Sequence, residues 1–216
     1  AEEAISRIEK AAFENCNKLT KITIGSGVET VNPYAFNQCN LLATVVFKDS
    51  NTANKKICER AFYYCGSLTE VDFGNAVTSI GDYAFTVCSK IKSLEFPDSL
   101  TSIGQFAFSP YTDGTGGTYK ESNLESVKFG TGLKTIGNYA FYDDRKISKL
   151  EFTDKLTSIG SYAFYNCGNL QSIAIPDNVT KIDNNTFENC SSLKSVSIGK
   201  SCTTISATAF NNATAL

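Results

Sequence analysis

Apolar residues recur along this chain with a fixed period, and the clearest marker of that period is a phenylalanine. It follows Ala in eight of its nine occurrences and Thr in the ninth. Six of the eight intervals between successive markers are 23 residues, and the other two are 26 and 33 residues. The nine markers are Phe13, Phe36, Phe62, Phe85, Phe108, Phe141, Phe164, Phe187 and Phe210. Such a period predicts a chain of stacked repeats, because one unit alone cannot bury its apolar residues.

Each marker is followed by a segment with the spacing of a short strand. In Leu68-Val71-Phe73 and its equivalents, the last three positions alternate between apolar and polar residues, the period of a strand with one buried face. Val, Ile and Phe are frequent in it, and Gly or Pro ends it, as at Gly74 and Pro97. We therefore expect one strand per unit, with neighbouring strands parallel and about 4.8 Å apart in a single curved sheet.

The opposite edge of the unit lies before the marker. A β-branched apolar residue precedes the marker by five positions, and glycine often follows it, as in Ile80-Gly81. We expect this edge to be extended. The next stretch, such as 82–85, is too short for a stable helix, so one or two helical or 3-10 turns are expected there. The β-branched residues are Ile8, Val31, Ile57, Ile80, Ile103, Ile136, Ile159, Ile182 and Ile205.

Six of the eight cysteines form a column three positions after the marker. The chain has no CxxC pair and no His, so the spacing is not that of a zinc site. An even number of cysteines is compatible with disulfides, but side chains stacked in a column point in parallel rather than at one another. We therefore predict free, buried thiols, and also free thiols at Cys58 and Cys202. The column holds Cys16, Cys39, Cys65, Cys88, Cys167 and Cys190.

Two insertions interrupt the period. Three extra residues fall within 48–56 and ten within 109–122, where Gly, Thr, Asp and Pro predict a loop. The cysteine column is lost beside the longer insertion, with Tyr111 and then Asp144 in its place. Insertions in repeat proteins often carry function, but a solvent-facing loop also tolerates changes of length at little thermodynamic cost. Both interpretations stay open, and neutral drift is the simpler one.

The string from Val77 to Ile91, VTSIGDYAFTVCSKI, resembles the BspA-like, or Treponema-type, bacterial leucine-rich repeat. The resemblance covers essentially the whole chain. It implies an α/β repeat solenoid: a right-handed leucine-rich-repeat coil with a curved parallel β-sheet on its concave face and short helical or 3-10 turns elsewhere. We expect residues 1–216 to form one domain of about nine units. The resemblance also implies an extracellular or cell-surface protein, often adhesin-like, and the family has no common catalytic residues.

The composition argues against several other functions. Twenty basic and 22 acidic residues give a net charge of −2, which provides no basic face for nucleic acid. No run of 18 apolar residues exists, so no membrane insertion by this segment is expected. Without His, the commonest general base is missing, and phosphate-binding glycine motifs are absent. We therefore expect no enzyme, no cofactor and no metal, and interpret Glu70/Asp72 and Asp143/Asp144 as solvated charge pairs rather than acid–base pairs.

The outward positions of the predicted strands form the candidate binding surface. Small hydroxyl groups are frequent there, and charges of both signs gather in the middle, which suits a protein or glycan partner. A solvated face without a partner is the alternative, and a structural spacer in a larger surface protein is the second candidate function. Tyr34 and its equivalents are expected to be partly buried packing. The candidate residues are Lys21, Thr23, Glu70, Asp72, Ser93, Glu95, Ser126, Lys128, Lys149 and Glu151, with Tyr111 and Tyr119 from the long loop.

Overall fold

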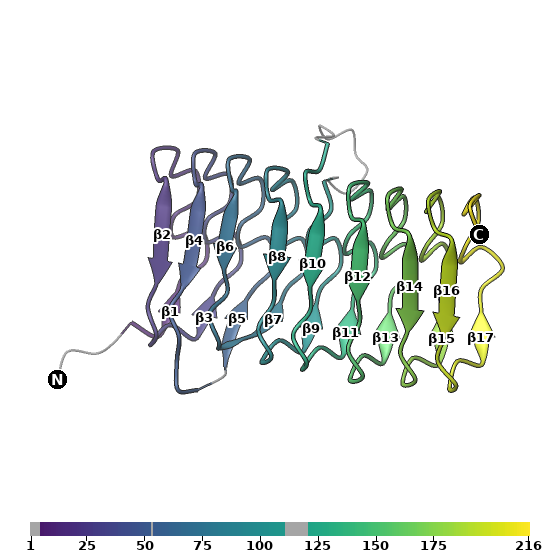
Figure 1. The fold of residues 1–216 in the computed structure, drawn as a ribbon. Coiled ribbons are helices and arrows are strands. Elements are labelled where there is room, and N and C mark those ends of the chain that lie inside the picture. The colour runs from purple at the N-terminus through teal and green to yellow at the C-terminus, as the bar shows by residue number, and fades with distance from the viewer. Residues whose placement is uncertain (1–4, 53, 111–120) are drawn as a thin grey trace.

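The chain folds as a parallel β-solenoid with two strand-bearing sides (Figure 1). The computed structural model describes residues 5–52, 54–110 and 121–216. Within them, eight strands of three or four residues, called the longer strands, alternate along the chain with nine called the shorter strands, which have two residues except β5 with three and β7 with four. The longer strands are β2 (Lys21–Ile24), β4 (Thr44–Phe47), β6 (Glu70–Asp72), β8 (Ser93–Glu95), β10 (Ser126–Lys128), β12 (Lys149–Glu151), β14 (Ser172–Ile175) and β16 (Ser195–Ile198).

The shorter strands confirm that the edge before each marker is extended. They are β1 (Arg7–Ile8), β3 (Thr30–Val31), β5 (Lys55–Ile57), β7 (Val77–Ile80), β9 (Ser102–Ile103), β11 (Thr135–Ile136), β13 (Ser158–Ile159), β15 (Lys181–Ile182) and β17 (Thr204–Ile205). Strands β1 to β13 of this series form one seven-stranded parallel sheet, and β15 pairs with β17. Ile103 of β9 stays in register with Ile136 of β11 although 33 residues separate them. The longer insertion therefore leaves the stacking of the repeat unchanged.

The longer strands do not form the single continuous sheet that the sequence predicts. They pair in three groups, β2-β4-β6, β8-β10-β12 and β14-β16. Strands β6 and β8 are consecutive along the solenoid (Figure 1), but they belong to different hydrogen-bonded sheets. This interruption lies beneath the candidate binding surface.

The predicted helical turns, and with them the α/β class, are wrong for the described residues, which contain strands and turns but no helix. In the turn around Phe85, alternate N–H groups have different partners. The Phe85 N–H donates to the Ala107 carbonyl oxygen in the next coil at 2.8 Å, whereas the Thr86 N–H donates locally to Tyr83 at 3.2 Å. A helix would make only local bonds, so the bonds between coils displace it.

Left-handed backbone at two positions per turn makes this alternation possible. Tyr83 has φ 56° and Val87 has φ 62°, and the equivalent positions of most other coils are also left-handed. Non-glycine residues adopt this conformation at a cost of about 1 kcal/mol each. The bonds between coils and the buried aromatic stack offset that cost, so the turn is stable only within the array.

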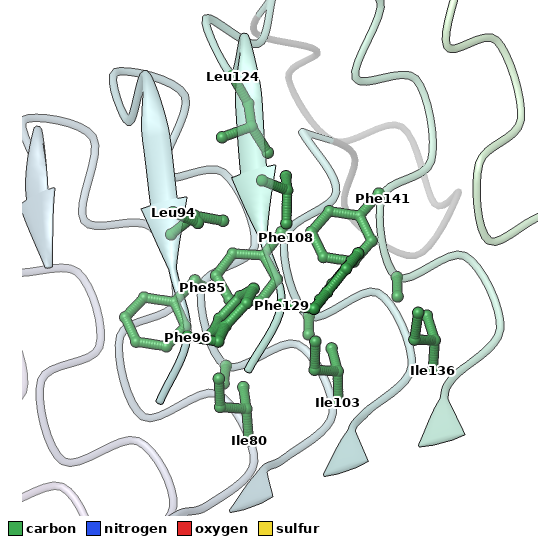
Figure 2. Close-up of a cluster of buried hydrophobic side chains, with 14 of the residues drawn as sticks. Ile80, Phe85, Leu94, Phe96, Ile103, Phe108, Leu124, Phe129, Ile136 and Phe141 are labelled. Atoms are coloured by element: carbon green, nitrogen blue, oxygen red, sulfur yellow. The ribbon is translucent and has the colours of Figure 1, made fainter. Parts of the chain in front are cut away.

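The core is a continuous stack of the nine marker phenylalanines. Successive rings are 5.0 to 5.6 Å apart between centroids and 3° to 8° from parallel. Phenylalanines from the ends of the longer strands pack edge-on against them, as Phe96 does against Phe108 at 5.5 Å (Figure 2). Offset and edge-on ring pairs each contribute about 0.5–1.5 kcal/mol beyond the area they bury. The interior is therefore an aromatic spine flanked by the isoleucines of the shorter strands.

The three-residue insertion places a lysine inside the molecule. Lys55 is only 2% exposed and occupies the place across from Val77 of β7, where the pairing of the strands is irregular. Its Nζ donates hydrogen bonds to the carbonyl oxygens of Gly25, Ser26 and Val28 at 2.9, 2.8 and 2.6 Å. Its aliphatic stem packs in the apolar interior, while its ammonium group binds the turn at 25–28 in the preceding coil.

Candidate binding face

The outward side chains of the eight longer strands form what we call the long-strand face. The structure brings ten predicted residues together on it, and all ten are exposed: Lys21, Thr23, Glu70, Asp72, Ser93, Glu95, Ser126, Lys128, Lys149 and Glu151. Parallel pairing in register sets their spacing, because Ser93, Ser126 and Lys149 are direct neighbours across β8, β10 and β12. Alternation along each strand sends Leu94 and Val127 into the core between them. The two other predicted residues, Tyr111 and Tyr119, lie outside the described residues.

A hollow of about 740 Å³ opens on this face where the pairing between β6 and β8 stops. Phe73, Phe96 and Phe129, the residues that follow β6, β8 and β10, line its floor. Polar groups on its rim include Asp72, Glu95, Asp98, Lys128 and Thr131. We call it the first hollow, and it combines an apolar base with charged walls.

A second hollow of about 540 Å³ lies beside the first, over β8, β10 and β12. Glu95 and Lys128 line both hollows and so separate them. The rest of its wall includes Ser93, Ser126, Lys149 and Glu151. The candidate residues of these three strands therefore surround one depression in the middle of the face.

Two ion pairs neutralise most of the charge over β8 to β12. Lys128 Nζ donates a short hydrogen bond to Glu95 Oε1 on the neighbouring strand, and this bond raises the pKa of Lys128. Lys149 and Glu151 pair along one strand at 2.6 Å, which lowers the pKa of Glu151. Both pairs are about three-quarters exposed, so solvent and salt screen them and their contribution to stability is small.

Acidic groups over β6 lack such compensation. In the described part of the chain, neither Glu70 nor Asp72 forms an ion pair. Asp72 Oδ1 accepts a hydrogen bond from the Gly74 N–H at 3.0 Å. Nearby Asp98 Oδ1 accepts from the Thr131 N–H at 2.7 Å, and this bond lowers the pKa of Asp98. The wall of the first hollow is therefore predominantly negative.

Sequence reasoning missed the turn residues of this site. Asp98, Gly130 and Thr131 follow the strands rather than belonging to them, so a search of alternating strand positions passes over them. The dipeptide Pro97-Asp98 was the available signal, because Pro and Asp together mark a turn whose side chain bonds to nearby backbone. Here Asp98 bonds to the backbone of the next coil, which only the stacked structure reveals.

The expectation that Asp143 and Asp144 form a solvated pair is wrong. Asp143 is 2% exposed and Asp144 is completely buried. Asp143 Oδ1 accepts a hydrogen bond from Arg145 Nε at 2.9 Å, whereas neither carboxyl oxygen of Asp144 accepts a well-formed hydrogen bond and the neighbouring Ser122 hydroxyl offsets only part of the effect of burial on its pKa. Burial raises the pKa of Asp144 well above the usual carboxyl value. Asp144 occupies the cysteine column of its coil, and that position faces inward.

The tyrosine column forms a different edge of the solenoid. Tyr34 and its equivalents Tyr83, Tyr139 and Tyr162 are half-buried, as predicted. Rings of this column stack between coils, with centroids of Tyr139 and Tyr162 4.7 Å apart. Arg60 takes the tyrosine position in its own coil, with its guanidinium 4.6 Å from the Tyr83 ring centroid. The faces of these tyrosine rings therefore pack against neighbouring coils of the solenoid.

The described residues contain no group of three His, Cys, Asp or Glu side chains placed to hold a metal ion. They also contain no helix long and apolar enough to cross a membrane.

Parallel strands stacked once per 23-residue unit, with a core of aligned apolar columns, define a β-solenoid of the leucine-rich-repeat class. The sequence profile of the BspA type leucine rich repeat region matches six copies, over residues 55–112 and 116–216. The chain belongs to this family. Proteins built on this repeat fold are generally binding scaffolds rather than catalysts. No curated protein matches the chain.

Solved structures with a similar fold come from several bacteria. The leucine-rich repeat protein of Treponema pallidum matches with a TM-score of 0.62 and 21% identity, over 92% of this chain and 78% of that one. A leucine rich cell surface protein of Faecalibacterium prausnitzii matches with a TM-score of 0.42 and 22% identity, over 98% of this chain and 81% of that one. At such identities the likeness concerns the fold alone, and the first match supports the repeat architecture.

Proposed function

We propose that this chain is a non-catalytic binding module that is secreted or displayed at the cell surface and engages a protein or glycan through the long-strand face. The observation that carries the proposal is the pair of adjacent hollows, lined by exposed charged and hydroxyl side chains on a rigid array of strands. Polar groups on regular strands are positioned more accurately than groups on loops, which favours a specific partner. The family resemblance supports the extracellular setting.

The test is an array of glycans and extracellular-matrix proteins probed with the intact chain. We expect at least one component to bind and to lose about tenfold or more in affinity when the central charges are removed. The face variant combines Glu70→Gln, Asp72→Asn, Glu95→Gln and Lys128→Gln, which removes three acids and one base.

A control variant makes the same change in net charge on surfaces away from the long-strand face. It combines Glu9→Gln, Glu29→Gln, Lys181→Gln and Asp183→Asn, and so also removes three acids and one base; it breaks the ion pairs of Lys181 with Asp183 at 3.1 Å and of Arg7 with Glu9 at 3.0 Å. We expect it to bind like the unmodified chain. If the face variant bound as tightly as the unmodified chain, the long-strand face would not be the binding surface.

The long loop is tested in parallel by deleting residues 111–120. Because Ile103 and Ile136 stay in register across the insertion, we expect the shortened chain to fold. Lost binding by this deletion, with retained binding by the face variant, would place the partner on the loop.

A structural spacer is the second candidate function. The unbroken phenylalanine stack from Phe13 to Phe210 favours it, because a continuous stack makes the array a stiff rod. A spacer predicts that no glycan or extracellular-matrix protein on the array binds the chain. It also predicts that small-angle X-ray scattering fits a single rigid shape.

A further inference from the structure

We propose that the partner reaches the long-strand face with an extended, lysine- or arginine-bearing peptide segment, one of whose cationic side chains occupies the first hollow. This inference rests on the proposed function, and it names the chemistry of the partner. Three features support it: the distribution of charge along the face, the apolar floor of the hollow, and the small hydroxyl side chains on the neighbouring strands.

The distribution of charge favours a cationic group. Glu95 and Asp72 line the first hollow together with Asp98, and Lys128 is the one basic side chain among its lining residues. Lys128 is already bonded to Glu95, and Lys128 and Lys155 lie close enough to Asp98 to lower its pKa, so Asp72 is left as net negative charge, with Glu70 on the same strand. An acidic partner would face these carboxylates and find both central lysines engaged with glutamates.

The floor suits the stem of a long basic side chain. Pro97 is half-buried and lines the hollow with apolar surface, whereas the rings of Phe73, Phe96 and Phe129 are 2–6% exposed and support the floor from the core side. Lysine and arginine cover apolar surface with their methylene groups while keeping the charged end among polar groups. Small cations would use the carboxylates but leave this floor unused, which favours a side chain over an ion.

The neighbouring strands suit an extended backbone. Beyond the first hollow, the face continues over the exposed Ser93, Ser126 and Ser172 on β8, β10 and β14. Between the last two lies Lys149 of β12, which is paired with Glu151. Small hydroxyls offer both donors and acceptors, so they accept an uncharged polar segment without steric conflict. We therefore expect one or two basic residues over β6 and β8, followed by small polar residues toward β14.

The experiment pans a random 12-residue peptide library, displayed on phage, against the intact chain. Fluorescein-labelled copies of the enriched peptides are then titrated against variants. We expect enrichment of Lys and Arg, about fivefold weaker binding to the Glu70→Gln/Asp72→Asn variant, and tighter binding to Lys128→Gln, because the two variants change the charge in opposite directions. Asp98 is left unchanged, because it holds the turn at Thr131.

The charge-matched control is Glu9→Gln/Glu29→Gln, which removes two acids away from the face. We expect its affinity to equal that of the unmodified chain, and the affinity of the unmodified chain to fall as salt screens the contact. If Glu9→Gln/Glu29→Gln lost as much affinity as Glu70→Gln/Asp72→Asn, net charge alone would attract the peptides. That result would overturn the inference.

Two further outcomes separate this inference from the proposed function. Enriched peptides without basic residues that still lose affinity in the face variant would overturn the cationic partner and leave the binding face intact. Basic peptides that bind Glu70→Gln/Asp72→Asn as tightly as the unmodified chain would overturn the inference and leave the proposed function to the array test. A library that yields no enriched peptide also overturns the inference, while the glycan and protein array tests the face separately.

Discussion

The Sγ of Cys65 lies 3.2 Å from the carbonyl oxygen of Phe36 in the preceding coil. The same thiol-to-carbonyl contact recurs for Cys39, Cys88, Cys167 and Cys190, each with the marker phenylalanine of the coil before it. A thiol is a small donor that fits a crowded interior and satisfies a buried carbonyl. The column therefore connects successive coils through side chains, in addition to the backbone bonds of the strands.

This contact predicts a division of the thiols by reactivity. All eight cysteines are unbridged, and Cys16, Cys58 and Cys202 are half-buried while the other five are buried. Burial raises the pKa of Cys39 and of Cys190 to about 12, so almost no reactive thiolate exists at pH 8. With iodoacetamide and no reductant, we expect mass spectrometry to show fast labelling confined to the half-buried thiols and slow labelling of the buried five.

Denaturation provides the control for the thiol prediction. In guanidinium chloride without reductant, all eight cysteines should be labelled, because none needs a bridge to be reduced first. Fewer than eight labels under these conditions would show disulfides and contradict the column of free thiols.

Asp144 predicts an unusual dependence of stability on pH. The folded state raises the pKa of Asp144, mainly because burial penalises its charged form, so the folded protein binds the proton more tightly than the unfolded one. Below the usual carboxyl pKa, Asp144 is neutral in both states and burial does not penalise it. As pH rises from that value to the raised pKa of the folded state, the free energy of unfolding falls. At pH 7 we expect Asp144→Asn to be more stable than the unmodified chain by about 1–3 kcal/mol.

Urea denaturation at several pH values measures this effect. The advantage of Asp144→Asn should shrink toward pH 4, and Asp144→Cys should behave similarly at pH 7, because it restores a thiol to the column. Asp154→Asn, at an exposed position, should change stability little at any pH. If Asp144→Asn proved less stable than the unmodified chain at pH 7, the buried carboxyl would have a partner that the structure does not show.

The repeat and both strand-bearing edges were predictable from the sequence, because phenylalanines, isoleucines and cysteines occupy fixed positions. The turn around Tyr83 and Val87 was not, since neither residue signals left-handed backbone and the stabilising bonds come from the next coil. The candidate strand residues were placed correctly because alternation decides which side chains face outward. The first hollow was missed because residues that follow β6, β8 and β10 line it, and no residue pattern shows how these three turns lie together.

Lys55 predicts a specific structural role for a charged side chain. Its ammonium binds three carbonyl oxygens of the turn at 25–28, and burial lowers its pKa. Lys55→Met keeps most of the buried stem but removes these three hydrogen bonds, so we expect a loss of about 1–3 kcal/mol in the free energy of unfolding. Urea denaturation measures the loss, and Lys56→Met, at the exposed neighbouring position, is the matched control. Equal stability of the two variants would mean that water replaces the ammonium without cost.

Gly130 connects the stability of the array with the shape of the binding face. A Cβ at this position would lie 2.1 Å from the carbonyl oxygen of Pro97, and both residues line the first hollow. Gly130→Ala must therefore push the Pro97 turn away, and we expect a loss of about 2 kcal/mol, or a fall in Tm of about 4–8 °C. At Gly25, a Cβ would meet nothing within 4 Å, so Gly25→Ala should leave Tm almost unchanged.

If the turn moves as expected, Gly130→Ala at a temperature where it stays folded should also weaken binding at the long-strand face, whereas Gly25→Ala should not. A Tm for Gly130→Ala equal to that of Gly25→Ala would show that the coils separate freely at this turn, contrary to the close contact in the structure.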